Sequence, residues 1–264
     1  MSIRVVVSGT GNMGREVLAA VAREADLEPA GVIEKFSSED ELALPDGAGT
    51  IPLSADPASL LDRTKPDVVI DFTNAEWTPH VARAALDRGV RLVIGSTGFP
   101  DQWLDSLEAE CRERGVGAVV AANFAIGAVL MIHLAKIAGR FFDAAEIIEL
   151  HHDRKVDAPS GTALTTAKDM LAARGRDFER NVPERETLAG SRAAEIGGVT
   201  IHSVRLPGLV AHQEVIFGGV GQTLSIRYDT TGRESFMPGV LLATREVMKR
   251  TTLVRGLAEL VGLT

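Results

Sequence analysis

The residues best suited to chemistry lie between Glu146 and Ala163, where two adjacent histidines and a lysine precede a Pro-Ser-Gly-Thr sequence. His151 and His152 end an apolar run that is typical of a buried strand, and Lys155 follows in a polar segment. A histidine can take up or release a proton near neutral pH, and a lysine adds a positive charge. This combination predicts acid–base chemistry on an anionic substrate.

The sequence that follows the lysine has the composition of a helix start. Ser160 or Thr162 could cap this helix, and the free backbone N–H groups beside the cap would bind a carboxylate. The alternative is a basic turn that caps a helix, with both histidines in structural roles. Successive residues of a strand face opposite ways, so both histidines can serve one site only if the strand ends between them.

A glycine-rich sequence directly follows the first apolar run of the chain and opens a helical segment. It reads Gly9-Thr10-Gly11-Asn12-Met13-Gly14. Glycines at these places let the backbone approach a pyrophosphate, whose charge the N-terminus of the following helix favours. The alternative is a tight strand–helix turn without a ligand. The position between strand and helix favours a dinucleotide site.

An acidic residue suited to the ribose of such a dinucleotide ends the second apolar run. Glu34 lies twenty positions after Gly14, where a carboxylate can accept hydrogen bonds from ribose hydroxyls. A carboxylate close to a 2′-phosphate costs up to ~4 kcal/mol per unit charge pair at surface-like dielectric, and the adjacent Lys35 could offset a comparable amount. The pair therefore predicts use of both NADH and NADPH, although Lys35 could also be a solvated surface residue.

Two further loops should lie at the carboxyl ends of parallel strands, where doubly wound sheets bind ligands. Their small residues admit a flat ring, and the side chain of Asn123 can hydrogen-bond a carboxamide. The candidate residues are Gly95, Ser96 and Thr97 in the first loop, and Ala121, Ala122, Asn123 and Phe124 in the second.

The elements that must position these residues follow two different patterns. In the first half, short and nearly continuous apolar runs alternate with helical segments, which predicts a doubly wound parallel sheet. In one of these segments Thr78 is expected to cap a helix that ends at Gly89. The apolar runs are Ile3–Ser8, Ala30–Glu34, Val68–Phe72, Arg91–Gly95 and Val116–Ala121.

Beyond about Asn123 the pattern changes. We expect a helix, a strand and a second helix over Ile126–Phe142, Glu146–His152 and Thr162–Arg174. Three strands of an antiparallel meander are then expected over Val199–Leu206, Val210–Phe217 and Thr223–Tyr228, followed by a helix over Met237–Arg250 with an apolar stripe.

The overall composition excludes several classes of protein. The formal net charge of −8 argues against a nucleic-acid surface, and Cys111 is the single cysteine, so no internal disulfide or cysteine-based zinc cluster can form. No apolar run reaches membrane-spanning length, and the first strand begins too early for a signal peptide. We therefore expect a cytoplasmic protein with no nucleic-acid or membrane partner.

The segment Glu146 to Ala163 resembles the signature of the dihydrodipicolinate reductase family, E-I-x-E-x-H-x-x-x-K-x-D-x-P-S-G-T-A, and meets every fixed position. The resemblance extends to Asp71-Phe72-Thr73, the Gly95 loop, Asn123 to Gly127 and Gly208 to Val215, so it covers nearly the whole chain. One departure is the glycine loop. Family members usually place two residues between the first two glycines, whereas here only Thr10 separates them.

The resemblance implies a Rossmann-like doubly wound parallel sheet plus a smaller α+β domain with an open mixed sheet. A dinucleotide-binding domain would comprise residues 1–122, with 232–264 returning to it. A substrate-binding and oligomerisation domain would comprise residues 123–231 and join a homotetramer. The implied activity is NAD(P)H-dependent reduction of 4-hydroxy-tetrahydrodipicolinate, a dicarboxylate, to tetrahydrodipicolinate in lysine and diaminopimelate biosynthesis.

Carried over to this sequence, the resemblance implies that His151 is the catalytic acid/base and Lys155 the second proton donor. The substrate carboxylates would bind His152, Gly161 and Thr162, with Ser160 nearby. The glycine loop, Glu34, Lys35 and the two later loops would bind the cofactor. A related amino-acid or diamino-acid dehydrogenase, and a non-catalytic redox sensor that only binds dinucleotide, are the alternatives.

Overall fold

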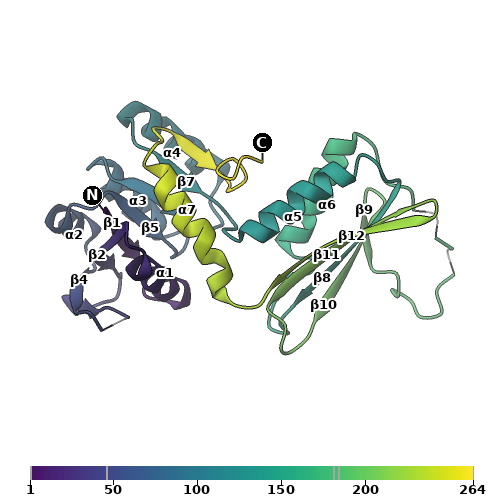
Figure 1. Cartoon of the computed structure of the whole chain (residues 1–264), viewed down its shortest axis with the longest axis horizontal. Helices are drawn as coiled ribbons and strands as arrows, with labels where there is room; N and C mark the ends of the chain where they lie inside the picture. Colours follow the sequence, from purple (N-terminus) through teal and green to yellow (C-terminus); the bar gives the residue numbers. More distant parts are fainter. Residues whose placement is uncertain (1, 46, 181, 184, 264) are drawn as a thin grey trace. The chain divides into compact units, whose positions relative to one another are not determined.

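Two sheets organise the chain in the computed structural model, which describes residues 2–45, 47–180, 182–183 and 185–263 (Figure 1). The chain divides into two compact units. Unit 1 comprises Met1–Ile126 and Phe236–Thr264, and unit 2 comprises Gly127–Ser235. Each is described by itself below.

The sheet of unit 1 has the strand order β13-β7-β6-β5-β1-β2-β4-β3. All neighbours pair in parallel except β3, which is antiparallel to β4. The order reverses between β1 and β5, so their carboxyl ends form the switch point at which doubly wound sheets bind ligands. The strands are β1 (Ile3–Ser8), β2 (Leu27–Ile33), β3 (Glu41–Ala43), β4 (Thr50–Ser54), β5 (Val68–Asp71), β6 (Arg91–Ile94), β7 (Ala118–Val120) and β13 (Leu253–Arg255).

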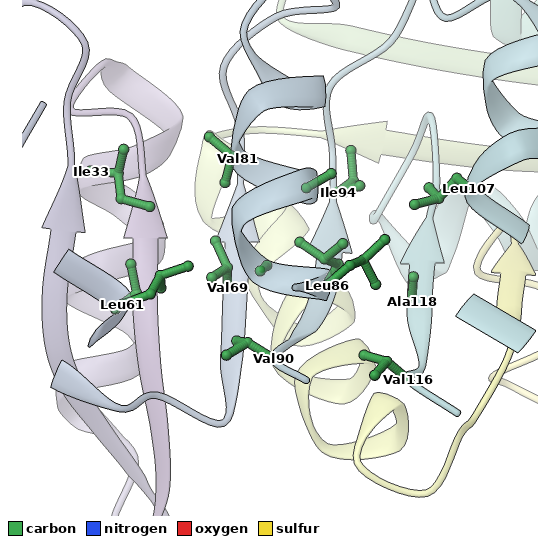
Figure 2. Close-up of a cluster of buried hydrophobic side chains, with 14 of the residues drawn as sticks. Ile33, Leu61, Val69, Val81, Leu86, Val90, Ile94, Leu107, Val116 and Ala118 are labelled. Carbon is green, nitrogen blue, oxygen red and sulfur yellow. The ribbon is translucent and has the colours of Figure 1, made fainter. Parts of the chain in front are cut away.

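Five helices belong to unit 1: α1 (Asn12–Arg23), α2 (Pro57–Thr64), α3 (Thr78–Leu86), α4 (Asp101–Arg114) and α7 (Met237–Val247). A core cluster joins the sheet to its covering helices through Val69 of β5, Val81 and Leu86 of α3, Ile94 of β6 and Leu107 of α4 (Figure 2). Because these strands are covered by helices, their sequences are almost continuously apolar.

The last helix packs within unit 1, although the chain reaches it only after leaving unit 2. α7 contacts α1, β6 and β7, and its Val240, Leu241 and Val247 are buried. Arg245 of the same helix forms ion pairs with Glu24 at 2.6 Å and with Asp26 at 2.7 Å. Apolar burial and charge pairing both hold this helix against the segment that follows α1.

Unit 2 contains a sheet of order β12-β11-β8-β10-β9, with α5 and α6 on one side (Figure 1). The buried Ala163, Ala167 and Met170 of α6 belong to a core cluster with Ile147 of β8 and Val215 of β11. The elements are α5 (Ile126–Ala138), β8 (Ala144–His151), α6 (Gly161–Arg174), β9 (Ala194–Ile196), β10 (Val199–Arg205), β11 (Ala211–Gly219), β12 (Gln222–Thr230) and the short 3₁₀ helix Arg233–Phe236.

The doubly wound sheet and the smaller mixed sheet confirm the predicted fold class, but the predicted meander was wrong in its pairing. β10 pairs with β8 in parallel, and β11 lies on the other side of β8, antiparallel to it. The connection from β8 to β10 carries α6, and a long connection of this kind permits a parallel crossover. Only β11 and β12 form the expected hairpin.

Three predicted helix boundaries were also wrong. α5 ends at Ala138, four residues before the predicted Phe142. Trp77, and not Thr78, is the N-cap of α3. As a cap, the Thr78 hydroxyl would accept from backbone N–H groups of the helix start, but it donates to the carboxylate of Asp71 at 2.5 Å. α7 ends at Val247, three residues before the predicted Arg250. No helix in the described part of the chain is both long and apolar enough to span a membrane.

Candidate functional site

The glycine loop of unit 1 is shaped by two steric requirements. Gly9 has a φ of +101°, which residues with a side chain rarely adopt. A Cβ on Gly14 would lie 1.9 Å from the carbonyl oxygen of Gly9, so only glycine allows α1 to approach the end of β1 this closely. Gly11 is the N-cap of α1 and makes no side-chain cap, and no atom lies within 4 Å of its Cβ position. The loop therefore leaves room for a phosphate at the start of α1.

Glu34 follows β2 and binds the glycine loop directly. Its Oε2 accepts hydrogen bonds from the backbone N–H of Thr10 at 2.8 Å and from the Thr10 hydroxyl at 2.6 Å. Partial burial raises the pKa of Glu34, but these hydrogen bonds outweigh it, so the pKa lies below the ordinary value. The carboxylate is thus ionised at neutral pH and can accept hydrogen bonds from ribose hydroxyls.

A cavity of about 320 Å³ opens beside this loop. Its lining includes Gly9 and Thr10 from the loop, Arg15 and Leu18 from α1, and Pro45 from the segment after β3. Arg15 donates from Nε to the Thr10 carbonyl at 2.9 Å. The loop clearance, the ionised Glu34 and this cavity together fit a dinucleotide. The sequence analysis missed Arg15 and the β3 hairpin, because neither belongs to the glycine motif.

Lys35 is not an isolated surface lysine. Its Nζ lies 3.5 Å from the Oε1 of Glu76, and 5.4 Å and 5.3 Å from the ring centroids of Phe36 and Trp77. The ammonium group is therefore held over aromatic faces next to Glu34.

A buried carboxylate organises the loops at the carboxyl ends of β5 and β6. Asp71 is fully buried and accepts hydrogen bonds from the hydroxyls of Thr73 at 2.8 Å, Thr78 at 2.5 Å and Ser96 at 2.9 Å. The Ser96 hydroxyl oxygen also accepts from the Thr73 N–H at 3.0 Å. This network places the predicted residues Gly95, Ser96 and Thr97 beside the segment after β5, and the sequence analysis gave Asp71 no role.

Replacement of Asp71 by alanine should destabilise the protein by about 3 kcal/mol, because buried hydroxyls then lose their acceptor. Urea unfolding of the Asp71→Ala variant measures this difference. Asp62→Ala is the matched control, since Asp62 pairs with Arg88 at 2.7 Å on the surface and should cost less than about 1 kcal/mol. Equal losses in the two variants would contradict an organising role for Asp71.

The predicted second loop contains both buried residues and a side chain with unused hydrogen-bond donors. Phe124 is buried, and its ring centroid lies 5.5 Å from that of Phe72. Asn123 accepts a hydrogen bond from the Ala125 N–H at 2.8 Å through its Oδ1, which leaves the Nδ2 donors for a ligand. Ala121 is buried, whereas Ala122 is exposed.

In unit 2, the strand ends between the two histidines. His151 is the last residue of β8, and His152 lies outside the strand. The condition for both histidines to serve one site is therefore met. The Nδ1 of His152 is buried and has no hydrogen-bond partner among the described residues. Lys155 donates from Nζ to Asp157 at 2.8 Å, and its positive charge lowers the pKa of His151.

His151 has a carboxylate partner that the sequence analysis did not assign. Its Nδ1 lies 2.5 Å from the Oε2 of Glu149, whose side chain is fully buried. Burial lowers the pKa of His151, and the nearby Lys155 and Arg205 lower it further, while Glu149 raises it. The net pKa lies below the ordinary value, so the resting imidazole is neutral at pH 7. The spacing of Glu149 and His151 on one strand face was a signal that could have identified the pair.

The helix start predicted to bind a carboxylate is present. Ser160 is the N-cap of α6 and accepts from the Ala163 N–H at 3.2 Å. Gly161 and Thr162 are the first two helical residues, so their N–H groups have no partner within the helix. No atom lies within 4 Å of the Cβ position of Gly161. Ser160 is thus the cap, and Gly161 and Thr162 are the free donors.

Comparison with known proteins identifies the family. Models for the N-terminus and the C-terminus of dihydrodipicolinate reductase match residues 3–124 and 127–261. The chain belongs to the dihydrodipicolinate reductase family. It is 50% identical over 262 residues to a 4-hydroxy-tetrahydrodipicolinate reductase of Dehalococcoides mccartyi, with 99% of both chains covered. A relative of the same name from Geobacillus kaustophilus is 48% identical over 264 residues, covering 99% of this chain and all of the relative.

A solved member of the dihydrodipicolinate reductase family agrees with this fold. The dipicolinate-bound dihydrodipicolinate reductase from Paenisporosarcina sp. TG-14 is 40% identical, with a TM-score of 0.89, and the match covers 98% of this chain and 99% of that one. The predicted family and the predicted enzyme class, an oxidoreductase with a nicotinamide dinucleotide cofactor, are therefore confirmed.

Proposed function

We propose that the chain catalyses the NAD(P)H-dependent reduction of 4-hydroxy-tetrahydrodipicolinate to tetrahydrodipicolinate, a step of lysine and diaminopimelate biosynthesis. The names of its full-length relatives support this reaction. The observation that carries the assignment of residues is the grouping in unit 2 of His151, Lys155 and the free helix start at Gly161.

Each predicted site residue of unit 2 has a chemical role in this proposal. The free N–H groups of Gly161 and Thr162 bind one substrate carboxylate, and His152 and the nearby Ser160 complete the anion site. This orients the substrate ring before reaction. The dianionic substrate raises the pKa of His151, so the imidazole becomes protonated when the substrate binds and can act as the acid. Lys155 is the second proton donor.

The net reaction takes up one hydride and one proton and releases the 4-hydroxyl group as water. When bound to unit 1, the dinucleotide supplies the hydride, which reaches C4 of the substrate ring. The chain's own residues supply the proton, at the carbon next to C4. The glycine loop and Glu34 hold the dinucleotide. The loops at Gly95–Thr97 and Ala121–Phe124 border the reactive ring.

Both NADH and NADPH serve as cofactors in this proposal. The ionised Glu34 favours the ribose hydroxyls of NADH, while the ammonium group of Lys35 favours the 2′-phosphate of NADPH. The aromatic contacts of Lys35 with Phe36 and Trp77 keep the charge near the end of β2 in either case.

The Lys35→Ala variant should raise KM for NADPH about five- to tenfold, because an exposed charge pair is worth about 1 kcal/mol. KM for NADH should change less than about twofold, since no charge on NADH faces this position. Initial-rate kinetics with each cofactor measure both values. Lys249→Ala is the control, because Lys249 is an exposed lysine paired with Glu246 at 2.7 Å. Equal effects on the two cofactors would contradict the role of Lys35.

A coupled assay tests the proposed reaction. Pyruvate and aspartate semialdehyde are supplied with the upstream synthase, and nicotinamide absorbance is followed with each cofactor. Oxidation of NAD(P)H that depends on the synthase is the expected result. Oxidation that depends on added ammonia would indicate a diamino-acid dehydrogenase instead, and tight NADH binding without turnover would indicate a dinucleotide sensor.

The proposal also covers the roles of the two units, the oligomeric state and the location in the cell. Unit 1 binds the dinucleotide, and unit 2 binds the substrate and joins a homotetramer in the cytoplasm. The edge strand β12 supports an interface on unit 2, because its Leu224 is exposed, as are Leu130 and Leu134 of α5. Measurement of the mass in solution tests the tetramer.

A further inference from the structure

We propose that Glu149 is a positioning residue that holds His151 in the tautomer protonated at Nδ1, so that Nε2 exchanges the proton with the substrate. The part that concerns the substrate rests on the proposed function, whereas the tautomer itself does not. Four contacts and the burial of Glu149 carry the inference.

Glu149 occupies a position where an apolar residue is the rule. It lies on the same face of β8 as Ala145 and Ile147, which are buried in the core of unit 2. The side chain is fully buried, so an isolated carboxylate here would be strongly disfavoured. A charge is retained at such a place only if it is paired and hydrogen-bonded.

Arg205 supplies that pairing. Its Nη2 donates to the Oε1 of Glu149 at 2.8 Å, and its Nη1 donates to Oε2 at 3.0 Å, which is the bidentate geometry of a strong ion pair. The guanidinium is itself anchored by the carbonyl oxygens of Asp157 at 2.6 Å and Val204 at 2.7 Å. Burial raises the pKa of Glu149, but Arg205, Ser203 and His151 outweigh it, and the pKa lies below its ordinary value.

An ionised carboxylate can only accept hydrogen bonds, and this decides the protonation of the imidazole. Because the Oε2 of Glu149 lies 2.5 Å from the Nδ1 of His151, that nitrogen must carry a proton. The neutral imidazole then has its lone pair on Nε2. The Nη1 and Nη2 groups of Arg205 donate to the carboxylate and to two carbonyl groups, so neither donates to the imidazole.

Glu149 also links His151 to the carboxylate-binding helix start. Its Oε1 accepts from the Ser160 N–H at 3.3 Å, next to Gly161 and Thr162. One carboxylate therefore sets the imidazole and the N-terminus of α6 relative to each other. The charged groups that act on His151 are Glu149 on its own strand, Lys155 in the turn after it and Arg205 on β10.

The tautomer can be measured without turnover. The full chain, labelled with ¹⁵N-histidine, is studied by NMR at about pH 8, where the His151 imidazole, whose pKa is lowered, is neutral. The resonances of His151 are identified by their absence from the His151→Ala spectrum. We expect a protonated Nδ1 and an unprotonated Nε2 in the unmodified protein. We also expect a loss of this preference in Glu149→Gln, because the glutamine amide cannot satisfy both Arg205 and His151.

Glu146→Gln is the matched control. Glu146 lies on the same strand and also pairs with a histidine, with its Oε2 2.8 Å from the Nε2 of His202, but it is half-exposed. This variant should leave the His151 spectrum and kcat unchanged. Glu149→Gln should lower kcat about 10²-fold, as expected for a misplaced acid, while KM for NADH stays within about twofold. It should also lower the pKa at which His151 titrates, because a negative charge is removed.

The outcomes separate this inference from the proposed function. A protonated Nε2 in the unmodified protein, or equal kcat values in Glu149→Gln and Glu146→Gln, overturns the positioning role even if the reductase is active. The expected tautomer in a protein without reductase activity overturns the proposed function and leaves the positioning role intact. If Glu149→Gln does not fold, Arg205→Lys replaces it. Loss of the bidentate contact should then lower kcat about tenfold and weaken the tautomer preference, and no change in either would overturn the inference.

Discussion

Replacement of His151 or Lys155 by alanine is expected to lower kcat by about 10²–10⁴-fold, the usual contribution of a positioned acid or base. In the proposed reaction these side chains supply the proton. His151 is fixed by Glu149 at 2.5 Å, and Lys155 is held by Asp157 at 2.8 Å. Steady-state kinetics in the coupled assay measure the effect.

Two controls test whether the losses are specific. Arg154→Ala removes an exposed cation next to Lys155, and His202→Ala removes the other histidine that pairs with a glutamate in unit 2. Both should keep kcat within about twofold. Unchanged turnover in both His151→Ala and Lys155→Ala would remove the assignment of the catalytic residues, and comparable losses in the controls would indicate general damage to the unit.

A methyl group at Gly14 is expected to disrupt the nucleotide unit. The new Cβ would lie 1.9 Å from the carbonyl oxygen of Gly9, and backbone atoms cannot rotate away as a side chain can. Either α1 or the end of β1 must move. The expected loss of stability is about 3 kcal/mol, the upper end of typical overpacking costs. NADH binding should fall with it, because the N-terminus of α1 no longer lies against the loop.

Gly11→Ala separates packing from ligand approach. No atom lies within 4 Å of the Cβ position of Gly11, so this variant should unfold at nearly the same urea concentration as the unmodified protein. Its affinity for NADH should still fall, since the methyl group occupies space that the pyrophosphate needs. If Gly14→Ala were as stable as Gly11→Ala, the close approach of α1 to β1 would not be the reason for glycine at position 14.

Local sequence signals were sufficient to predict most of the strands and helices of unit 1. The predicted run Ile3–Ser8 coincides with β1, and a proline and a glycine stand at the two ends of α4, with Gly115 at a φ of +65°. These signals are short-range: an apolar run, a proline before a helix, a glycine after it. The short strands β3, β4 and β13 were not predicted, because charged residues, polar residues or a proline interrupt their apolar sequences.

Pairing in unit 2 could not be derived in the same way. The runs that became β10 and β11 are adjacent in the sequence, and a hairpin was the simplest prediction. Instead β8 lies between them, because its alternating buried residues pack under α6 and both neighbours complete its hydrogen bonds. Which strands become neighbours depends on the joint burial of several elements, and no single run contains that information.

The candidate site also combines features that can be read from the sequence with features that only the tertiary structure shows. By itself, the sequence determined the residue types and their order: a glycine loop after the first strand, an acidic residue after the second, and a His-His-x-x-Lys segment before a capped helix. The tertiary structure alone decided the protonation state of His151. Arg205 lies on β10, far along the chain from β8, and the parallel register places it level with His151. Its ion pair keeps the buried Glu149 ionised. Because burial opposes ionisation, the carboxylate keeps its charge in the core only where the two adjacent strands bring Arg205 to it.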